Sequence, residues 1–427
     1  MTGNVIPRRL KQTKESDNQL VAHFIKEMSK GEAILMTMQF RDLKKQYSVL
    51  REDIDRAMLA VAASGAFIMG PQVRELEQEL AGYVGVKHCL GCANGTDALT
   101  LALKAWGIGP GDAVFVPDFT FFSSAEVVSL EGATPVFVDV CERTFNLDPE
   151  DLERAIRQVI SEGRLTPKVI VAVDLFGLPA DYARIRETAD RYGLWILEDG
   201  AQGFGGSIEG RLACSFGDIA TTSFFPAKPL GCYGDGGAVF TDNDDWAALI
   251  ASYRVHGKGS FKYDNVRIGL NSRLDTLQAA ILQVKFKAFR EYELDAVNAA
   301  AERYTSLLSD VVETPVVPEG FRSSWAQYTV RLRDAAQRDA LQASLKAAGI
   351  PSMVYYPKPM HLQTAFSDPF VGLQPSQDDN DMSFRAQRRN LETASSLCTR
   401  VLSLPMHPYL TDEDINTVCS VIKDSLR

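Results

Sequence analysis

Short apolar runs alternate with helical patterns between residues 88 and 225, and this alternation constrains the fold more than any other feature. The four clearest runs are 113–116, 135–140, 168–173 and 195–198. Amphipathic helical patterns, such as those at 149–160 and 182–192, separate them. Strands that are apolar on both faces and joined by helices are typical of a mostly parallel sheet covered by helices on both sides. The sequence therefore predicts an α/β fold.

The alternation ends near residue 241, where a different pattern begins. A long helical stretch at 274–298 leads into a shorter segment with fewer strands. Within that segment we expect strands at 326–331 and 352–356. A polar stretch of about 366–389, rich in Asp, Gln and Ser, is typical of a mobile loop.

These patterns divide the chain, whose 427 residues exceed the usual size of one domain. We predict a large domain at 38–298 and a smaller α+β domain at 299–427. Residues 1–37 contain no apolar signal core and are expected to form a flexible or helical extension.

Composition excludes several classes of protein. A net charge of -10 argues against a nucleic-acid or anionic-membrane partner, and no apolar run reaches the ~18 residues that span a bilayer. Seven scattered cysteines indicate a reducing compartment, so we expect a cytoplasmic protein. Cys89 and Cys92 have C-x-x-C spacing, but no second pair of this kind completes a metal set, and we expect no metal.

The segment Asn94-Gly-Thr-Asp97 lies between a short apolar run and a helical pattern. Backbone N–H groups in the first turn of a helix lack partners within the helix and bind phosphate well. Gly95 and Thr96 are therefore candidates for a phosphate site, although Thr96 could instead cap the helix.

Two further candidates follow expected strands. Asp199 comes at the carboxyl end of the run 195–198, the edge where ligands collect in parallel sheets. A buried carboxylate there needs a partner such as a protonated ring nitrogen, or it caps the next turn. After the run 113–116, Phe121 or Phe122 could stack on a planar ring or belong to the core.

Lys228 lies in an unusual setting, with Pro226 and Pro229 close on either side and Gly234-Asp-Gly-Gly237 just after. Prolines limit the backbone freedom of such a segment. A lysine among apolar groups and other cations loses its proton more readily, as Schiff-base chemistry requires. Ser223 can add a hydroxyl to a phosphate site. The alternative is a lysine that simply extends from an apolar surface into solvent.

These motifs together describe a pocket for pyridoxal 5′-phosphate (PLP). A phosphate-binding turn, a strand-end acid, an aromatic side chain and a fixed lysine follow one another in one α/β chain. With PLP, the cofactor is the electron sink, and the protein supplies a lysine for the Schiff base and an acid for the ring nitrogen.

Four ordered motifs also carry a resemblance to a known family. They are Cys92-Ala-Asn-Gly-Thr-Asp-Ala98, Glu198-Asp-Gly-Ala-Gln202, Ser223-Phe-Phe-Pro-Ala-Lys228 with Gly234-Asp-Gly-Gly237, and Gly269-Leu-Asn-Ser-Arg-Leu-Asp275. From about Gln39 to its C-terminus the chain resembles the DegT/DnrJ/EryC1/StrS family of nucleotide-sugar aminotransferases. The resemblance implies the aspartate-aminotransferase architecture, fold type I, with PLP as cofactor.

The resemblance also implies the chemistry. Lys228 is implied to form the Schiff base with PLP and to move the proton in transamination, and Asp199 to keep the pyridine nitrogen protonated. Sugar dehydratases of this fold carry histidine at the lysine position, so Lys228 favours transamination. The implied amino donor is L-glutamate, which leaves as 2-oxoglutarate while the cofactor carries the amine as pyridoxamine 5′-phosphate (PMP).

Other positions match residues that bind the cofactor in the family. Those implied within one chain are Gly95, Thr96 and Ser223 at the phosphate, Phe121 over the ring, and Gln202 near the ring and its O3′. Asn271 matches a residue that the neighbouring subunit donates to the phosphate, although on its own it could be an ordinary helix cap. A homodimer with shared active sites is implied.

The acceptor is less strongly defined by the motifs. The segments 223–241, 267–280 and 401–409 most resemble enzymes that aminate UDP-2-acetamido-2-deoxy-3-oxo-glucuronate for surface polysaccharides. Alternatives are C4 amination of a UDP- or dTDP-linked 4-keto-6-deoxy sugar, and a non-catalytic regulator with the PLP fold. The candidates for substrate contact are Arg273, Tyr355, Tyr356 and Lys358. Close relatives often have His-Tyr-Pro where this chain has Tyr355-Tyr-Pro357.

Overall fold

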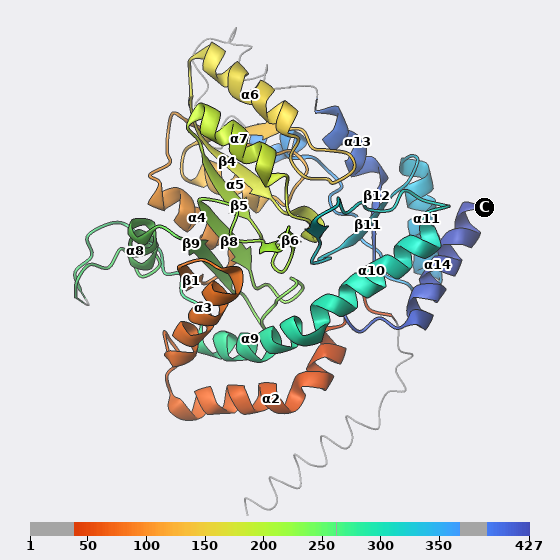
Figure 1. Cartoon of the computed structure of the whole chain (residues 1–427), viewed down its shortest axis with the longest axis horizontal. Helices are drawn as coiled ribbons and strands as arrows, with labels where there is room; N and C mark the ends of the chain where they lie inside the picture. Colours follow the sequence, from red (N-terminus) through yellow and green to blue (C-terminus); the bar gives the residue numbers. More distant parts are fainter. Residues whose placement is uncertain (1–37, 262, 368–390) are drawn as a thin grey trace, which may run out of the picture. The chain divides into compact units, whose positions relative to one another are not determined.

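A seven-stranded sheet lies at the centre of the structure (Figure 1). The computed structural model describes residues 38–261, 263–367 and 391–427, so the predicted extension 1–37 and nearly all of the predicted loop 366–389 lie outside the described residues. The strands of the sheet are β1 (His88–Cys92), β2 (Asp112–Pro117), β3 (Thr134–Val138), β4 (Thr166–Val173), β5 (Trp195–Asp199), β8 (Ile219–Ser223) and β9 (Gly237–Thr241).

The order across the sheet is β1-β9-β8-β5-β4-β2-β3. Neighbours from β8 to β3 pair in parallel, whereas β9 is antiparallel to both β8 and β1. The prediction of a mostly parallel sheet is confirmed. Because β9 reverses direction between β8 and β1, β1 runs parallel to β8, and its carboxyl end reaches the same edge of the sheet.

Helices cover both faces of this sheet. They are α4 (Gly95–Ala105), α5 (Ser123–Leu130), α6 (Pro149–Glu162), α7 (Tyr182–Tyr192) and α8 (Asp244–Tyr253). Alternate residues of β2 serve two separate cores: Val114 and Val116 pack in the core with α4, α5 and α8, while Phe115 packs in the core with α6 and α7. Period-two side chains of this kind explain why the strands read as continuous apolar runs. Helix α8 was not predicted.

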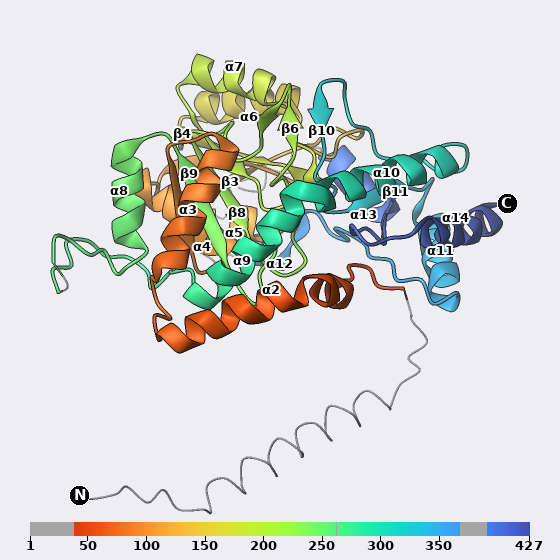
Figure 2. The ribbon, with the colours of Figure 1, turned by 60° about the horizontal axis from the view of Figure 1, so that its bottom comes forward.

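A second group of helices lies outside the set that was just described. It comprises α2 (Leu43–Ser64), α3 (Pro71–Val84), α9 (Thr276–Ala288), the π turn η2 (Phe289–Glu293) and α10 (Leu294–Leu308). Helix α2 packs along α9, as both views show (Figures 1 and 2). The long helical stretch expected at 274–298 is therefore present. The predicted boundary between residues 298 and 299 falls inside α10, and the division into two domains stays a prediction.

The remaining elements are smaller. The helical ones are η1 (Leu175–Gly177), α11 (Ala335–Ala347), η3 (Met360–Leu362), α12 (Thr364–Ser367), α13 (Glu392–Arg400) and α14 (Asp412–Leu426). The strands are β6 (Ser207–Ile208), β7 (Arg211–Leu212), β10 (Phe321–Arg322), β11 (Tyr328–Arg331) and β12 (Val401–Leu404). Strands β11 and β12 pair antiparallel, and β10 pairs with β6. Among the described helices, none has the length and apolar character that crossing a membrane requires.

The strand expected at 352–356 is wrong. Only Met353 forms a bridge there, exchanging backbone hydrogen bonds of 3.1 and 2.8 Å with Ser403. Pro351 and Pro357 flank the segment and have no N–H to donate, so a β ladder cannot continue through either end. The segment instead forms an irregular loop that carries two tyrosines toward the sheet.

Candidate active site

The predicted site residues follow strands whose carboxyl ends share one edge of the sheet. Gly95 and Thr96 follow β1, and Phe121 follows β2. Asp199 ends β5 and Gln202 comes after it, while Ser223 ends β8 and Lys228 comes after it. This edge is where ligands bind in parallel sheets. Segments that are more than a hundred residues apart in sequence are thus brought together by the sheet alone.

The proposed phosphate end is built around two glycines. Helix α4 begins at Gly95 and is capped by Asn94, whose Oδ1 accepts the backbone N–H of Asp97 at 2.8 Å. The alternative role of Thr96 as the cap is therefore not what the structure shows. A Cβ on Gly95 would lie 2.7 Å from the Cβ of Ser223, and one on Gly237 would lie 2.6 Å from the carbonyl of Asn94. Only glycine permits this approach, which brings the Ser223 hydroxyl beside the first turn of α4.

Lys228 occupies a tight turn after β8. Its backbone N–H donates to the carbonyl of Phe225 at 2.8 Å, and its carbonyl accepts from Nη2 of Arg41 at 2.7 Å. The lysine is half-buried. Burial lowers the pKa of Lys228, the carboxylate of Asp199 opposes this shift, and the charge of Arg41 adds to it. The amine is therefore easier to deprotonate than an exposed lysine.

Asp199 is buried at the end of β5. Its Oδ2 accepts the hydroxyl of Ser124 at 2.8 Å, and its Oδ1 accepts the backbone N–H of Ala201 at 3.2 Å, so it also fixes the next turn. Burial raises the pKa of Asp199, while the Ser124 hydrogen bond and the charge of Lys228 lower it. The carboxyl is thus held in place near a cation but lacks full solvation, as a partner for a protonated ring nitrogen requires.

Gln202 links the sheet edge to the loop 353–359. Its Oε1 accepts the backbone N–H of Phe176 at 2.7 Å, and its Nε2 donates to the hydroxyl of Tyr356 at 3.0 Å. The Tyr356 ring lies 6.1 Å from Phe119 and 6.2 Å from Phe121, measured between ring centroids. Phe121 is 52% exposed, which leaves an aromatic surface beside the site.

The same loop is tied to β2 by a second contact. Nδ1 of His361 lies 2.6 Å from Oδ2 of the fully buried Asp118, whose Oδ1 accepts the His361 backbone N–H at 2.8 Å. The carbonyl of Asp118 also accepts the N–H of Met360 at 2.9 Å. These bonds fix the loop that carries Tyr355 and Tyr356 against the residues that precede Phe121.

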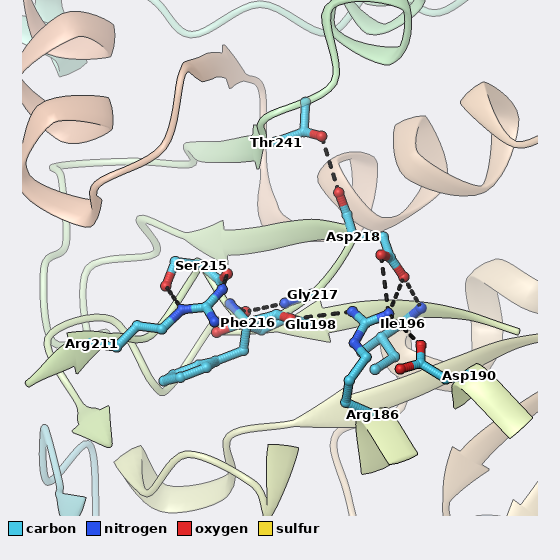
Figure 3. Close-up of polar contacts among 10 residues, drawn as sticks. All are labelled: Arg186, Asp190, Ile196, Glu198, Arg211, Ser215, Phe216, Gly217, Asp218 and Thr241. Carbon is cyan, nitrogen blue, oxygen red and sulfur yellow. Dashed lines mark hydrogen bonds and ion pairs between the residues drawn. The ribbon is translucent and has the colours of Figure 1, made fainter. Parts of the chain in front are cut away.

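Figure 3 shows how the connection between β5 and β8 is held. The buried carboxylate of Glu198 accepts the backbone N–H groups of Phe216 at 2.7 Å and Gly217 at 2.9 Å, and it also accepts that of Cys214. Asp174 lies nearby, where it accepts the Tyr182 hydroxyl at 2.8 Å. Burial raises the pKa of both Asp174 and Glu198, because the charged carboxylates lose their hydration. The charge of Glu198 raises the pKa of Asp174 further, whereas the backbone N–H groups that Glu198 accepts lower its own pKa.

We expect Glu198→Gln to lower the free energy of unfolding by about 1–3 kcal/mol, because the amide would leave at least one backbone N–H unpaired. Since the folded pKa of Glu198 is raised above 4.5, its contribution is fully present below pH 4.5 and decreases as the pH rises. The difference from wild type should therefore be larger at pH 5 than at pH 8 in urea unfolding. Exposed Glu52→Gln is the control, and equal stability of Glu198→Gln and wild type at pH 5 would contradict this account.

The other predicted residues are placed with fewer contacts. Asn271 is exposed and pairs with Val255 in an isolated bridge, so its predicted role toward a neighbouring subunit stays a prediction. Tyr355 packs its ring 6.1 Å from that of Phe40. Arg273 and Lys358 are half-buried. Their proposed role toward substrate therefore remains a hypothesis.

Sequence reasoning missed several residues of this site. Arg41 and Ser124 contact Lys228 and Asp199 directly, and Asp118 with His361 fixes the tyrosine loop. None of them lies in a motif that marks chemistry. Ser124 lies two residues after Phe122, close in sequence to a candidate of the site. This position was the only feature of the sequence that could have indicated a hydroxyl contact to Asp199.

The residues at this edge fit PLP. The first turn of α4 and the Ser223 hydroxyl could hold a phosphate, and the close approach at Gly95 leaves no room for any larger residue there. A buried carboxylate, Asp199, could pair with a protonated pyridine nitrogen, and the amine of Lys228 could react with an aldehyde.

Comparisons with known proteins agree with this reading. Over 387 residues the chain is 43% identical to a UDP-2-acetamido-2-deoxy-3-oxo-D-glucuronate aminotransferase from Pseudomonas aeruginosa, covering 90% of this chain and 99% of the relative. It is 40% identical over 387 residues to a UDP-N-acetyl-3-dehydro-alpha-D-glucosamine 3-aminotransferase from Acidithiobacillus ferrooxidans, covering 90% and 97%. A pleiotropic regulatory protein from Geobacillus stearothermophilus is 40% identical over 396 residues, covering 92% and 99%.

Solved structures give the same architecture. A DegT/DnrJ/EryC1/StrS aminotransferase from Brucella abortus is 48% identical, with a TM-score of 0.84 over 91% of this chain and 99% of its own. NtdA from Bacillus subtilis, solved with its bound cofactor PMP, is 29% identical, with a TM-score of 0.76 over 88% of this chain and 82% of its own. Fold type I, which the family resemblance implied, is thereby confirmed.

The family model of these aminotransferases matches residues 48–423, which include every element of the sheet and every predicted site residue. The match excludes only the first 47 and the last four residues. As predicted, the chain belongs to the DegT/DnrJ/EryC1/StrS aminotransferase family.

Proposed function

We propose that this protein is a PLP-dependent aminotransferase that moves the amino group of L-glutamate onto a keto nucleotide-sugar. The acceptor we favour is a UDP-linked 2-acetamido-3-oxo uronic acid, a precursor of surface polysaccharides. One observation carries the proposal: Lys228, Asp199 and the Gly95–Ser223 contact share one sheet edge in a chain 43% identical to an aminotransferase of that acceptor.

Each residue then has a task. When bound, PLP supplies an electron sink for the bond broken at the substrate carbon. Lys228 would hold the cofactor and, once released, its Nζ would move the proton from that carbon, aided by its lowered pKa. Asp199 would favour a positive charge on the ring nitrogen, and Ser223 with the first turn of α4 would hold the phosphate.

We also propose a homodimer in which Asn271 contributes to the partner's site. Exposed apolar side chains near the Asn271 segment support this. Ile268 precedes Asn271 by three residues and is 90% exposed, while Phe67 and Ile68 are 46% and 52% exposed and Ile68 forms a bridge with Asp275. Burying such side chains in a second copy would be favourable. Light scattering of the holoenzyme should give the mass of two chains, whereas a fully active monomer would contradict the shared site.

We place the reaction in the cytoplasm. All seven cysteines lie among the described residues and all are free, which suits a reducing compartment. A nucleotide-sugar acceptor and glutamate would both be available there.

A panel of acceptors tests the proposal. Purified holoenzyme would be mixed with L-glutamate and with UDP-linked 3-oxo uronate, UDP-linked 4-keto and dTDP-linked 4-keto sugars, and 2-oxoglutarate formation would be measured. We expect kcat/KM for the 3-oxo uronate to be at least about tenfold higher than for the 4-keto sugars. The 4-keto sugars carry the keto group on a different carbon and lack the carboxylate, so the enzyme would lose its contacts to both groups. Turnover of the 4-keto sugars alone would reject this acceptor.

A regulatory role is the second candidate, because one relative is named a pleiotropic regulatory protein. A regulator needs the fold but no reactive lysine, and this chain retains Lys228, Asp199 and Ser223 in one place. If glutamate fails to convert the bound cofactor to its amine form, a regulatory function would be favoured over the proposed aminotransferase activity.

A further inference from the structure

Residues 225–229 form the turn that carries Lys228, here called the lysine turn. Among the described residues, Arg41 alone donates hydrogen bonds from a charged side chain to the main chain of this turn. Its Nη2 donates to the carbonyl of Lys228 at 2.7 Å and to that of Pro229 at 3.3 Å. Because Pro229 has no N–H and Pro226 precedes Lys228 by two residues, a regular ladder cannot form through this turn. Arg41 therefore satisfies carbonyls that secondary structure leaves without partners.

The placement of Arg41 is fixed from both sides. The carbonyl of Phe40 accepts the N–H of Met406 at 3.1 Å, and the Phe40 ring packs 6.1 Å from that of Tyr355. On the other side, Asp42 caps α2 by accepting the N–H of Lys45 at 2.8 Å. The segment thus joins the lysine turn, the tyrosine loop and the start of α2.

The charges around Arg41 are unevenly balanced. Glu293 is 3% exposed and lies near the guanidinium, where it accepts Nε2 of Gln46 at 2.9 Å and the hydroxyl of Tyr409 at 2.6 Å. Lys285 is 2% exposed, and burial together with the charge of Arg41 lowers its pKa to about 8, although Glu293 opposes this shift. Burial lowers the pKa of Arg41 to about 10, so it stays charged at neutral pH.

Two more groups complete this environment. Burial lowers the pKa of His407 to about 4, so the histidine is neutral near pH 7 and adds no charge beside Arg41. The carboxylate of Asp199, at the end of β5, raises the pKa of Lys228 and so opposes the effect of Arg41. Three basic side chains, Arg41, Lys228 and Lys285, are therefore compensated by two carboxylates, Glu293 and Asp199.

We propose that Arg41 is a positioning residue for Lys228, holding its main chain in place and setting a positive charge beside its amine. The inference rests on the proposed function, since it concerns the lysine that would hold PLP. A positive charge near an ammonium group favours its neutral form. Two hydrogen bonds from one guanidinium also limit the movement of the turn, which matters because small displacements of a reacting group cost rate.

The test is a pH titration of the absorption band of the lysine-linked cofactor in purified holoenzyme. Arg41→Met removes the charge and the hydrogen bonds, so the apparent pKa of the lysine-linked nitrogen should rise by about half a unit to one unit. Arg41→Lys keeps the charge but cannot reach both carbonyls in the same way. Its titration should match that of wild type, while conversion of the cofactor by glutamate should be about tenfold slower.

Arg56→Met is the matched control, because Arg56 lies on the exposed surface of α2, where it pairs with Asp53 at 2.9 Å. It should titrate and react like wild type. An Arg41→Met holoenzyme with an unchanged titration would overturn the proposal. If Arg41→Met gives no folded holoenzyme, the Arg41→Lys variant provides the test. Conversion of the cofactor by Arg41→Lys at the wild-type rate would then overturn the proposal. A wild-type protein without the band would instead reject the proposed function itself.

Discussion

Lys228→Ala should lower the rate of amino transfer from glutamate by at least about 10³-fold, because it removes both the attachment point of the cofactor and the base that moves the proton. The variant should also lose the absorption band of a lysine-linked cofactor. Alanine fits the half-buried turn without a clash, and the main-chain bonds to Phe225 and Arg41 do not involve the side chain. The folded structure should therefore persist.

Lys87→Ala is the matched control for this loss. Lys87 is exposed and lies 3.7 Å from Asp244, at the opposite end of β1 from the site. Its removal should leave rate and spectrum unchanged. A Lys228→Ala enzyme that retained more than about a tenth of the wild-type rate with its cofactor band would exclude the lysine as the reacting group.

Asp199→Asn should lower the rate of the glutamate half-reaction by about 10²–10³-fold, because a neutral amide does not favour the protonated ring nitrogen as a carboxylate does. The amide keeps the size of the side chain, and its Oδ1 can still accept the N–H of Ala201. Removal of the negative charge should also lower the pKa of Lys228 further, since Asp199 now raises it.

Stopped-flow absorbance after mixing with glutamate measures this loss. Asp53→Asn, on the exposed face of α2, is the control and should react at the wild-type rate. Ser124→Ala removes only the hydroxyl that donates to Asp199 at 2.8 Å, so its effect should be smaller, about tenfold or less. An Asp199→Asn rate within twofold of wild type would show that the carboxylate is not the partner of the ring nitrogen.

The sheet and its ligand edge could be predicted because strand periodicity is a local property. Runs such as 168–173 are apolar on both faces, and the structure shows why, since Val169 and Ile170 face two different cores. The residues that follow each strand, from Gly95 to Lys228, then had to meet at one edge. Their roles in the chemistry came from motif spacing and from the family resemblance.

The rest could not be predicted, because it depends on contacts between distant segments. Arg41 reaches Lys228 across 187 residues, and Asp118 reaches His361 across 243, without any periodic signal at either end. The segment 352–356 has the composition of a strand, but its proline neighbours and its isolated bridge to Ser403 decide otherwise. In this segment the tertiary contacts, and not the strand propensity of the residues, determine the backbone conformation.

The most direct measurement locates the covalent link itself. Holoenzyme treated with borohydride would be digested and analysed by mass spectrometry to find which lysine carries the reduced cofactor. Lys285 is the natural internal competitor, because it is buried and burial lowers its pKa to about 8. We expect the modification on Lys228 alone, whereas modification of Lys285 or of no lysine would contradict the role of Lys228 as the lysine that binds the cofactor.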